Sequence, residues 1–414
     1  MIPLFDHFFR HAGGYGIAVL AAYLVIGLWP FNFITANRAS IGPAGGLVLA
    51  RPGTAYEAQR AEKLHGLTQF SISLDLATAT DGLSSFEKIF SLARSQEQMN
   101  FIVGQWKDGV VLHIPDPARQ AEIHFGEYGV FRIGERTALT IVYDGMHLFL
   151  YRDGKRIKAR RTGPLLLERW SREYPIVIGT DAFGRSQWKG TVYEISLWDR
   201  ALAPGEIQTL SINGQTADSG QQTGRSSQGL QHAGGSSDQG NGSGPLIHYV
   251  FRPEFTHGTE HGGRKALAVR ELGRGAPADL VIPEQFIPYE RTVLAWETNW
   301  MDNKTNWQDA AVNLLGFIPF GALLFLQAAR RKTAGSRQQT AGSAEICGLV
   351  IVAVAAGFAV SLSIEWLQAY LPSRDSSMRD LAMNTAGTLL GALAAAWMMR
   401  QRMQGRPERT ESEF

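Results

Sequence analysis

Apolar runs long enough to cross a lipid bilayer constrain this chain most. Three lie in the last third of the sequence, at about residues 308–329, 346–368 and 379–399, and a fourth lies near the start, at 14–33. A helix of about 20 apolar residues spans the hydrocarbon core of a membrane. The sequence therefore predicts a four-helix transmembrane bundle.

The first run has a second interpretation, as the apolar core of a signal peptide, because Arg10 precedes it. The run is longer than such a core. It also ends in aromatic side chains typical of a membrane interface, Trp29, Phe31 and Phe33. We therefore expect it to be retained as the first transmembrane helix.

Polar side chains recur at helical spacing inside these runs. Glu365 and Gln368 are three residues apart and Asp380 and Asn384 are four apart, so each pair shares a helix face. Ionisable groups in a membrane usually face a bundle interior or a wet cavity. The alternative is a helix hairpin whose polar groups are simply solvated. The candidate polar membrane site consists of Asp309, Asn313, Glu365, Gln368, Arg374, Asp380 and Asn384.

Small and helix-breaking residues also occur in these runs. Pro319 and Gly321 interrupt helix regularity in the run at 308–329. Gly387 and Gly391 have the GxxxG spacing that permits close contact between helices. We expect these four residues to serve helix packing or a kink.

Basic residues predict the orientation. They follow the runs at 308–329 and 379–399, and basic loops stay on the cytoplasmic side of a membrane. Four spans then place both termini in the cytoplasm and the long middle segment on the outer side of the membrane. The basic residues are Arg330, Arg331, Lys332, Arg337, Arg400, Arg402, Arg406 and Arg409.

The middle of the chain reads as an all-β sandwich. Short alternating segments such as FSISLDLAT and TVYEISLWD follow one another from about residue 45 to 210. The pairs Asp144-Gly145 and Asp153-Gly154 predict hairpin turns, since glycine accepts a positive φ. Many short strands without long helices are typical of a β-sandwich.

Residues 211–245 are rich in Gly, Ser and Gln and predict a flexible linker. The β-segment at 246–292 is expected to complete the sandwich; a separate small β-unit is the alternative, although so few strands are marginal alone. Trp296, Trp300 and Trp307 then mark either return to the membrane or a surface amphipathic helix. The expected domains are 1–40, 41–210, 211–245, 246–292, 293–400 and a tail, 401–414.

Two stretches carry resemblances to known families. ALTIVYDGMHLFLYRDGKRI, YPIVIGT and WKGTVYEISLWDRALAPGEI are similar to laminin-G-like, concanavalin A-type jelly rolls. In that family the last strand precedes a short helix, here around Ala203 to Ile207. The resemblance implies a jelly-roll fold but fixes no ligand.

DAAVNLLGFIPFG and SLSIEWLQAYLPSRDSSMRDLAMNTAGTLLG resemble the signature stretches of the VanZ-like membrane family. That family takes its name from a member linked to glycopeptide resistance, and the resemblance implies a cell-envelope protein of the bacterial plasma membrane without fixing a reaction. The positions that match its motif are Asn313, Pro319, Phe320, Gly321, Glu365, Gln368, Arg374, Asp380, Asn384 and Gly387.

Three functions follow from these features. The leading one is a non-enzymatic envelope protein that binds glycan or a protein partner outside, with a lipid-linked cell-wall precursor engaged in the membrane and Arg374 meeting an anionic headgroup. The second is an intramembrane enzyme using Glu365 and Asp380 as acid and base. The third is a proton-coupled transporter using the same carboxylates.

Composition excludes other classes. With 40 basic and 38 acidic residues, the chain has no field that favours nucleic acid, and Cys347, its one cysteine, excludes disulfide frameworks and cysteine metal clusters. No cofactor is expected. Ca²⁺ in the jelly roll is a weaker expectation, at turn acids Asp144, Asp153 and Asp181. Histidines are interpreted as scattered surface or loop residues: His7, His11, His65, His113 and His124.

Overall fold

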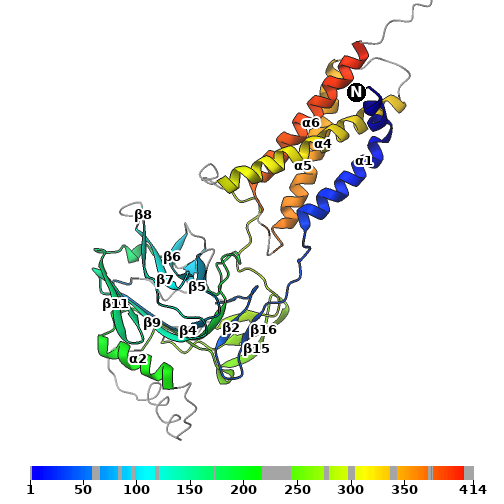
Figure 1. The fold of residues 1–414 in the computed structure, drawn as a ribbon. Coiled ribbons are helices and arrows are strands. Elements are labelled where there is room, and N and C mark those ends of the chain that lie inside the picture. Colours follow the sequence, from blue (N-terminus) through cyan, green and yellow to red (C-terminus); the bar gives the residue numbers. More distant parts are fainter. Residues whose placement is uncertain are drawn as a thin grey trace, which may run out of the picture. The chain divides into compact units, whose positions relative to one another are not determined.

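The computed structural model describes residues 2–57, 66–82, 86–94, 98–116, 121–171, 173–216, 244–274, 279–296, 304–335, 343–371, 374 and 376–404. Contacts within the chain divide it into two compact units. The membrane unit consists of Met1–Phe33 and Arg291–Phe414, and the jelly-roll unit is Ile34–Glu290 (Figure 1).

The jelly-roll unit contains two antiparallel sheets (Figure 1). The first has eight strands in the order β1-β2-β13-β4-β9-β10-β11, with β14 also paired to β13. These strands are β1 (Ala39–Ile41), β2 (Leu47–Leu49), β4 (Phe70–Thr78), β9 (Arg136–Tyr143), β10 (His147–Arg152), β11 (Lys155–Arg161), β13 (Gly190–Trp198) and β14 (Ile247–Val250).

The second sheet has nine strands in the order β15-β16-β17-β3-β12-β5-β6-β7-β8. Its strands are β3 (Ala55–Glu57), β5 (Glu87–Ala93), β6 (Met99–Trp106), β7 (Gly109–Asp116), β8 (Ala121–Glu127), β12 (Ile176–Ile178), β15 (Thr256–His261), β16 (Arg264–Val269) and β17 (Leu280–Pro283). Two 3₁₀ turns, η2 (Leu167–Arg169) and η3 (Pro253–Phe255), lie in the connections. The predicted all-β sandwich is confirmed.

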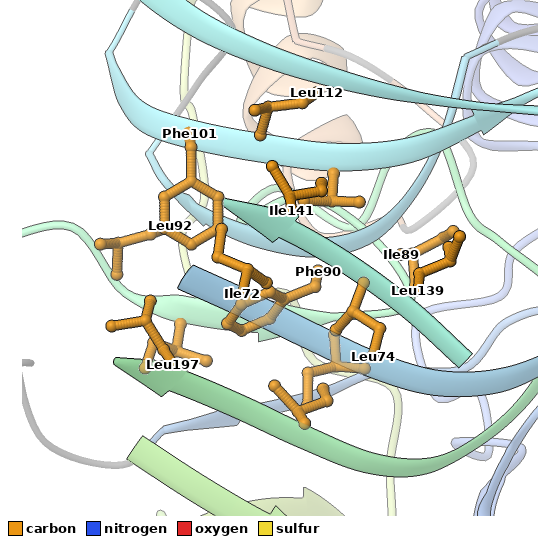
Figure 2. Close-up of a cluster of buried hydrophobic side chains, with 14 of the residues drawn as sticks. Ile72, Leu74, Ile89, Phe90, Leu92, Phe101, Leu112, Leu139, Ile141 and Leu197 are labelled. Carbon is orange, nitrogen blue, oxygen red and sulfur yellow. The ribbon is translucent and has the colours of Figure 1, made fainter. Parts of the chain in front are cut away.

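The core lies between the two sheets. In β4, Ile72 and Leu74 are buried and alternate with side chains on the other face, as a period of two requires. They meet Phe90 and Phe101 from the nine-stranded sheet (Figure 2). Each such apolar side chain contributes about 1.5–3 kcal/mol by leaving water.

Both predicted hairpins form. Asp153 and Gly154 connect β10 to β11 with φ angles of 50° and 76°. Gly145 has a φ of 101° between β9 and β10, where Oδ1 of Asp144 accepts hydrogen bonds from the backbone nitrogens of Met146 and His147.

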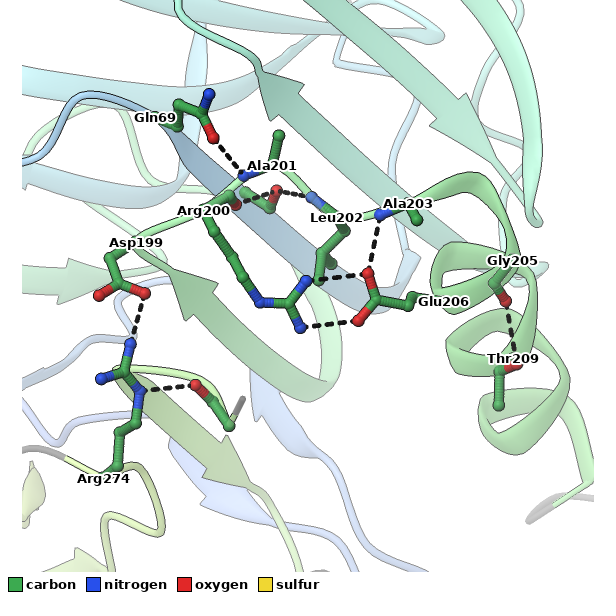
Figure 3. A network of polar contacts seen from close by, with 12 residues as sticks. Gln69, Asp199, Arg200, Ala201, Leu202, Ala203, Gly205, Glu206, Thr209 and Arg274 are labelled. Carbon is green, nitrogen blue, oxygen red and sulfur yellow. Dashed lines mark hydrogen bonds and ion pairs between the residues drawn. The ribbon is translucent and has the colours of Figure 1, made fainter. Parts of the chain in front are cut away.

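Helix α2 (Pro204–Thr216) is longer than the short helix expected around Ala203 to Ile207. Pro204 is its first residue. The side chain of Glu206 accepts a hydrogen bond from the backbone nitrogen of Ala203 at 2.8 Å and so caps the N-terminus of the helix (Figure 3). Ile207 packs against Val142 and Trp198. Residues 211–216 of the predicted linker are therefore helical, and 217–243 lie outside the described residues.

Strands after the predicted linker join both sheets. Tyr249 of β14 pairs with Ile195 of β13, and Val281 of β17 pairs with Tyr56 of β3. A separate small β-unit is therefore wrong for this segment. The two ends of the unit also lie together: Ala36 and Gln285 form a bridge, and the backbone nitrogen of Phe286 donates to the oxygen of Thr35 at 2.8 Å.

The membrane unit has four described helices, α1 (Ile2–Leu28), α4 (Lys304–Gly335), α5 (Ser343–Gln368) and α6 (Met378–Gln404). Three are long and apolar enough to span a membrane, over Trp307–Lys332, Ser343–Gln368 and Met378–Gln401. In α1 the apolar part that the structure describes is shorter, Gly14–Leu28, because the helix ends before Trp29 and Pro30. Three of the four expected spans therefore have helices long and apolar enough to cross a membrane, and the bundle of four spans is not confirmed.

Glycines bring α4 and α6 into close contact. A β-carbon on Gly391 would lie 1.9 Å from the oxygen of Ile318, and one on Gly387 would lie 2.2 Å from that of Leu314. From the opposite side, one on Gly321 would lie 2.0 Å from the oxygen of Thr388. Pro319 lies inside α4 with an exposed side chain. These glycines allow the two backbones to touch.

Candidate functional site

Glu365 is the most deeply buried acid in the membrane unit among the described residues, with 2% of its surface exposed. It lies near the end of α5. Its Oε2 atom accepts a hydrogen bond from the backbone nitrogen of Ser377 at 2.8 Å, just before α6 begins. The partial positive charge of a helix N-terminus favours a carboxylate at this position.

Asp380 lies in the first turn of α6, beside Glu365. Both carboxylates lie near the connection between α5 and α6. Arg379 donates from Nε to Oδ1 of Asp380 at 3.3 Å, and the side chain of Asn313 on α4 hydrogen-bonds the same carboxylate. Asp309, one turn before Asn313, is exposed and adds negative charge near Asp380.

Asn384 lies one turn further along α6 and is buried. Its Nδ2 donates to the hydroxyl of Ser361 on α5 at 2.9 Å, and Thr388 donates to its backbone oxygen at 2.9 Å. Its Oδ1 atom has no hydrogen-bond partner among the residues that the structure describes. A buried acceptor in this state is available to a donor from water or a ligand.

Gln368 and Arg374 have different partners from the other predicted residues. Nε2 of Gln368 donates to the oxygen of Gly27 at 2.8 Å. Arg374 donates from Nε to the oxygen of Trp29 at 3.1 Å and from a terminal nitrogen to that of Ile26 at 3.3 Å. Both side chains satisfy carbonyls at the end of α1, where a helix leaves acceptors unpaired.

The structure thus brings Asn313, Glu365, Asp380 and Asn384 together from α4, α5 and α6. We call these four residues the polar cluster. Sequence reasoning missed three neighbours that take part: Arg379, Ser361 and Thr388. Helical spacing could have found two of them, because Ser361 lies four residues before Glu365 and Thr388 four after Asn384. The cluster can accept protons and bind donors.

The jelly-roll unit carries a second polar group on the outer face of the nine-stranded sheet. His113 of β7 lies directly opposite His124 of β8, and the rings stack at 4.1 Å. Phe86 stacks on the other side of His113 at 4.3 Å. Burial lowers the pKa of His113 to about 4, assisted by the charges of His124 and Lys88. The interpretation of these histidines as scattered is wrong, because strand pairing joins them.

The turn acids considered for Ca²⁺ are engaged within the fold. Asp153 accepts from the backbone nitrogen of Ala138 at 3.0 Å, and Asp181 accepts from Lys88 at 2.8 Å. Asp144 closes its own hairpin, as described above. Across the described ranges, one set of three metal-ligand side chains lies close together, and it is His113, Glu122 and His124.

Family models match both parts of the chain. Residues 246–399 match the VanZ/LLP1 model, and residues 64–208 match the model of the concanavalin A-like lectin/glucanases superfamily. These are the two families that the motifs resemble, so that prediction is confirmed. The chain combines a VanZ-like membrane region with a laminin-G-like, lectin-type domain. No curated protein matches the chain.

Solved structures resemble the jelly-roll part at low identity. The receptor-binding domain of botulinum neurotoxin type G is 16% identical, with a TM-score of 0.29, over 35% of this chain and 38% of that one. The Ruminococcus gnavus IT-sialidase CBM40 bound to α2,3-sialyllactose is 10% identical, with a TM-score of 0.32, over 41% of this chain and 100% of that one. Domain 4 of AbnA, a Geobacillus stearothermophilus arabinanase, in complex with arabinotriose, is 18% identical, with a TM-score of 0.34, over 43% and 86%.

Proposed function

We propose that this chain is a bacterial envelope membrane protein whose jelly-roll unit binds glycan outside the cytoplasm. One observation carries the proposal. The whole sandwich, Ile34–Glu290, is inserted in the chain between α1 and the three spanning helices. A lectin-type domain tethered at both ends is held at a membrane surface.

Charge supports placing the sandwich outside. Arg330, Arg331 and Lys332 lie at the end of α4, and Arg400 lies at the end of the apolar part of α6. The positive-inside rule assigns these ends to the cytoplasm. The start of α4, to which the sandwich is joined through residues 291–303, then lies on the opposite side. This orientation also makes the N- and C-termini cytoplasmic if α1 crosses.

The outer face of the nine-stranded sheet is the surface that we assign to the glycan. Trp106 ends β6, and alternation with core-facing Phe101 and Val103 places it on this face, 38% exposed. His124 and Glu122 are exposed on the same face of β8, two strands away from β6. An exposed aromatic ring provides stacking area for a small polar ligand, and polar groups elsewhere on the same face provide hydrogen bonds.

Glycan binding is tested on the full-length chain in lipid nanodiscs applied to an array of bacterial envelope glycans. We expect selective binding that Trp106→Ala reduces at least about tenfold, the effect of losing about 1.4 kcal/mol. Ile157→Ala is the matched control, because Ile157 lies on the other sheet and is 40% exposed. A blank array with folded protein, or equal loss in both variants, contradicts the proposal.

The polar cluster favours a second function, contact with the polar part of a lipid-linked precursor. Buried Glu365, neighbouring Asp380 and the unpaired Oδ1 of Asn384 supply an acid–base pair and an acceptor at one place. An intramembrane enzyme would use the two carboxylates as acid and base. Proton-coupled transport is a third use of the same groups.

Glu365→Gln separates these uses from simple packing. It keeps the acceptor for Ser377 but removes the charge, so membrane abundance stays normal while tolerance to a glycopeptide antibiotic falls. Glu345→Gln is the control, since Glu345 lies on the same helix, exposed and paired with Lys332 at 2.9 Å. Unchanged tolerance to the antibiotic in Glu365→Gln would contradict the hypothesis of an intramembrane enzyme. A flux assay that stays flat across a pH gradient ends the transport reading.

A further inference from the structure

A cross-strand pair of histidines stands beside a carboxylate on the jelly-roll unit. His113 and His124 are direct partners in the β7–β8 ladder. Glu122 is two residues before His124, so both project from the same face of β8. All three side chains therefore lie on the outer face of the nine-stranded sheet.

The ligand atoms are already near the spacing that a metal requires. Oε2 of Glu122 is 3.0 Å from Nε2 of His124 and 4.0 Å from Nδ1 of His113. All three atoms lie within 4.8 Å of one another. Two ligands bound tetrahedrally at zinc distances are separated by about 3.4 Å.

We propose that His113, Glu122 and His124 bind a divalent transition metal of the zinc class. Two imidazoles and one carboxylate are a three-ligand set that Zn²⁺ uses, with a fourth position left for water or another ligand. Imidazole nitrogen favours such metals over Ca²⁺ and Mg²⁺, which prefer oxygen ligands. The three ligands lie on the face that we assign to the glycan, and metal binding is measured without glycan, so the two proposals are tested separately.

Binding needs a small rearrangement. The two imidazole rings lie nearly parallel, at 5° to one another, whereas a shared metal must lie near the plane of each ring. His113 is held between Phe86 and His124 and is 16% exposed. The side chains of His124 and Glu122 are 58% and 42% exposed, so they can turn towards Nδ1 of His113 without repacking the core.

The surrounding charges permit a cation. Lys88 is the nearest base acting on His113, and its ammonium is paired with Asp181 at 2.8 Å. Arg160 directs a terminal nitrogen to the backbone oxygen of His124, and Lys158 pairs with Glu127 at 3.0 Å. The charges of Lys88 and Lys158 are thus paired with carboxylates, and Arg160 binds a backbone oxygen, so the carboxylate of Glu122 gives the site its negative charge.

The test uses full-length protein in detergent, stripped with a chelator and titrated with ZnCl₂ by calorimetry. We expect one saturable site per chain in competition with excess Ca²⁺. His124→Gln and His113→Gln should each raise the Kd at least about tenfold, as loss of a supporting contact already does at metal sites. The matched control is His147→Gln, because His147 also faces a carboxylate, Asp144 at 3.3 Å, but no third ligand accompanies them among the described residues.

A second measurement protects against misfolding of the variants. Zn²⁺ should raise the Tm of the wild type and of His147→Gln, and should not raise that of His124→Gln, whose exposed side chain can be changed without disturbing the core. The proposal is overturned if Zn²⁺ does not bind, if Ca²⁺ displaces it, or if His124→Gln binds as tightly as the control.

Discussion

The carboxylate of Glu365 accepts a hydrogen bond from the backbone nitrogen of Ser377 at 2.8 Å, which ties the end of α5 to the start of α6. Glu365→Ala leaves this buried N–H without its acceptor, and we expect a loss of about 1–3 kcal/mol of stability. Glu365→Gln should lose less, because an amide oxygen can replace the carboxylate oxygen. Thermal unfolding in detergent measures both, and equal losses would show that the charge, rather than the acceptor, matters.

The contact between α4 and α6 depends on the absence of a side chain at Gly391. Gly391→Ala would place a β-carbon 1.9 Å from the oxygen of Ile318, so the helices must separate. Overpacking of this kind costs about 1–3 kcal/mol or more. Gly316→Ala is the control, since a β-carbon there meets nothing within 4 Å. A Tm that falls equally in both variants would contradict the close packing.

The hydroxyl of Tyr143 lies at the end of β9 and holds two loops together. It donates a hydrogen bond to the oxygen of Gly145 at 2.7 Å and accepts one from the backbone nitrogen of Leu165 at 2.7 Å. The oxygen of Gly163 also lies within hydrogen-bonding distance of this hydroxyl, at 3.1 Å. Tyr143→Phe removes these partners of the Gly145 oxygen and the Leu165 nitrogen and should cost about 1–3 kcal/mol. Chemical unfolding measures the loss. Tyr128→Phe, at an exposed tyrosine, should have no effect; a similar loss there would refute the assignment.

The start of α2 should respond to acid. Hydrogen bonds from Arg200 hold the pKa of Glu206 below its usual value of 4.5, although burial opposes the shift (Figure 3). A lowered folded-state pKa means that this stabilisation is present above about pH 4.5 and is lost as the pH falls through the folded value. The pair is largely exposed, so the effect is about 0.5–1 kcal/mol.

Far-UV circular dichroism during unfolding at pH 6 and at pH 3 measures this dependence. Glu206→Gln keeps an acceptor for the backbone nitrogen of Ala203 but cannot titrate, so it should remove this part of the pH dependence. The slope should also shrink in high salt, which screens exposed charges. An identical slope in wild type and variant would assign the acid sensitivity to other carboxylates.

Local patterns were enough to predict the sandwich and the last three spans. Alternation predicts β4 and β13, and a glycine with positive φ predicts the Asp153-Gly154 hairpin. These features depend on residues close together in the chain. The same reasoning placed Asp380 and Asn384 on one face of α6, where the structure has them beside Glu365.

Long-range pairing could not be predicted in the same way. Arg374 binds carbonyls of Trp29 and Ile26, more than 300 residues away, so its role at the end of α1 has no local signal. The pairing of His113 with His124 depends on the β7–β8 register, which alternation within either strand does not fix. The end of α1 at Leu28, in contrast, had a local signal that we did not use: Pro30 lies within the run at 14–33, and a helix usually ends at or before the residue that precedes a proline.

The bridge between Ala36 and Gln285 has a consequence for how such a chain is assembled from modules. The chain enters and leaves the sandwich at adjacent positions. An insert of more than 250 residues therefore separates its two ends by no more than a short loop would. A few glycines and serines could therefore replace the whole insert without stretching the helical host. Conversely, a different ectodomain with adjacent ends could be grafted at the same two positions.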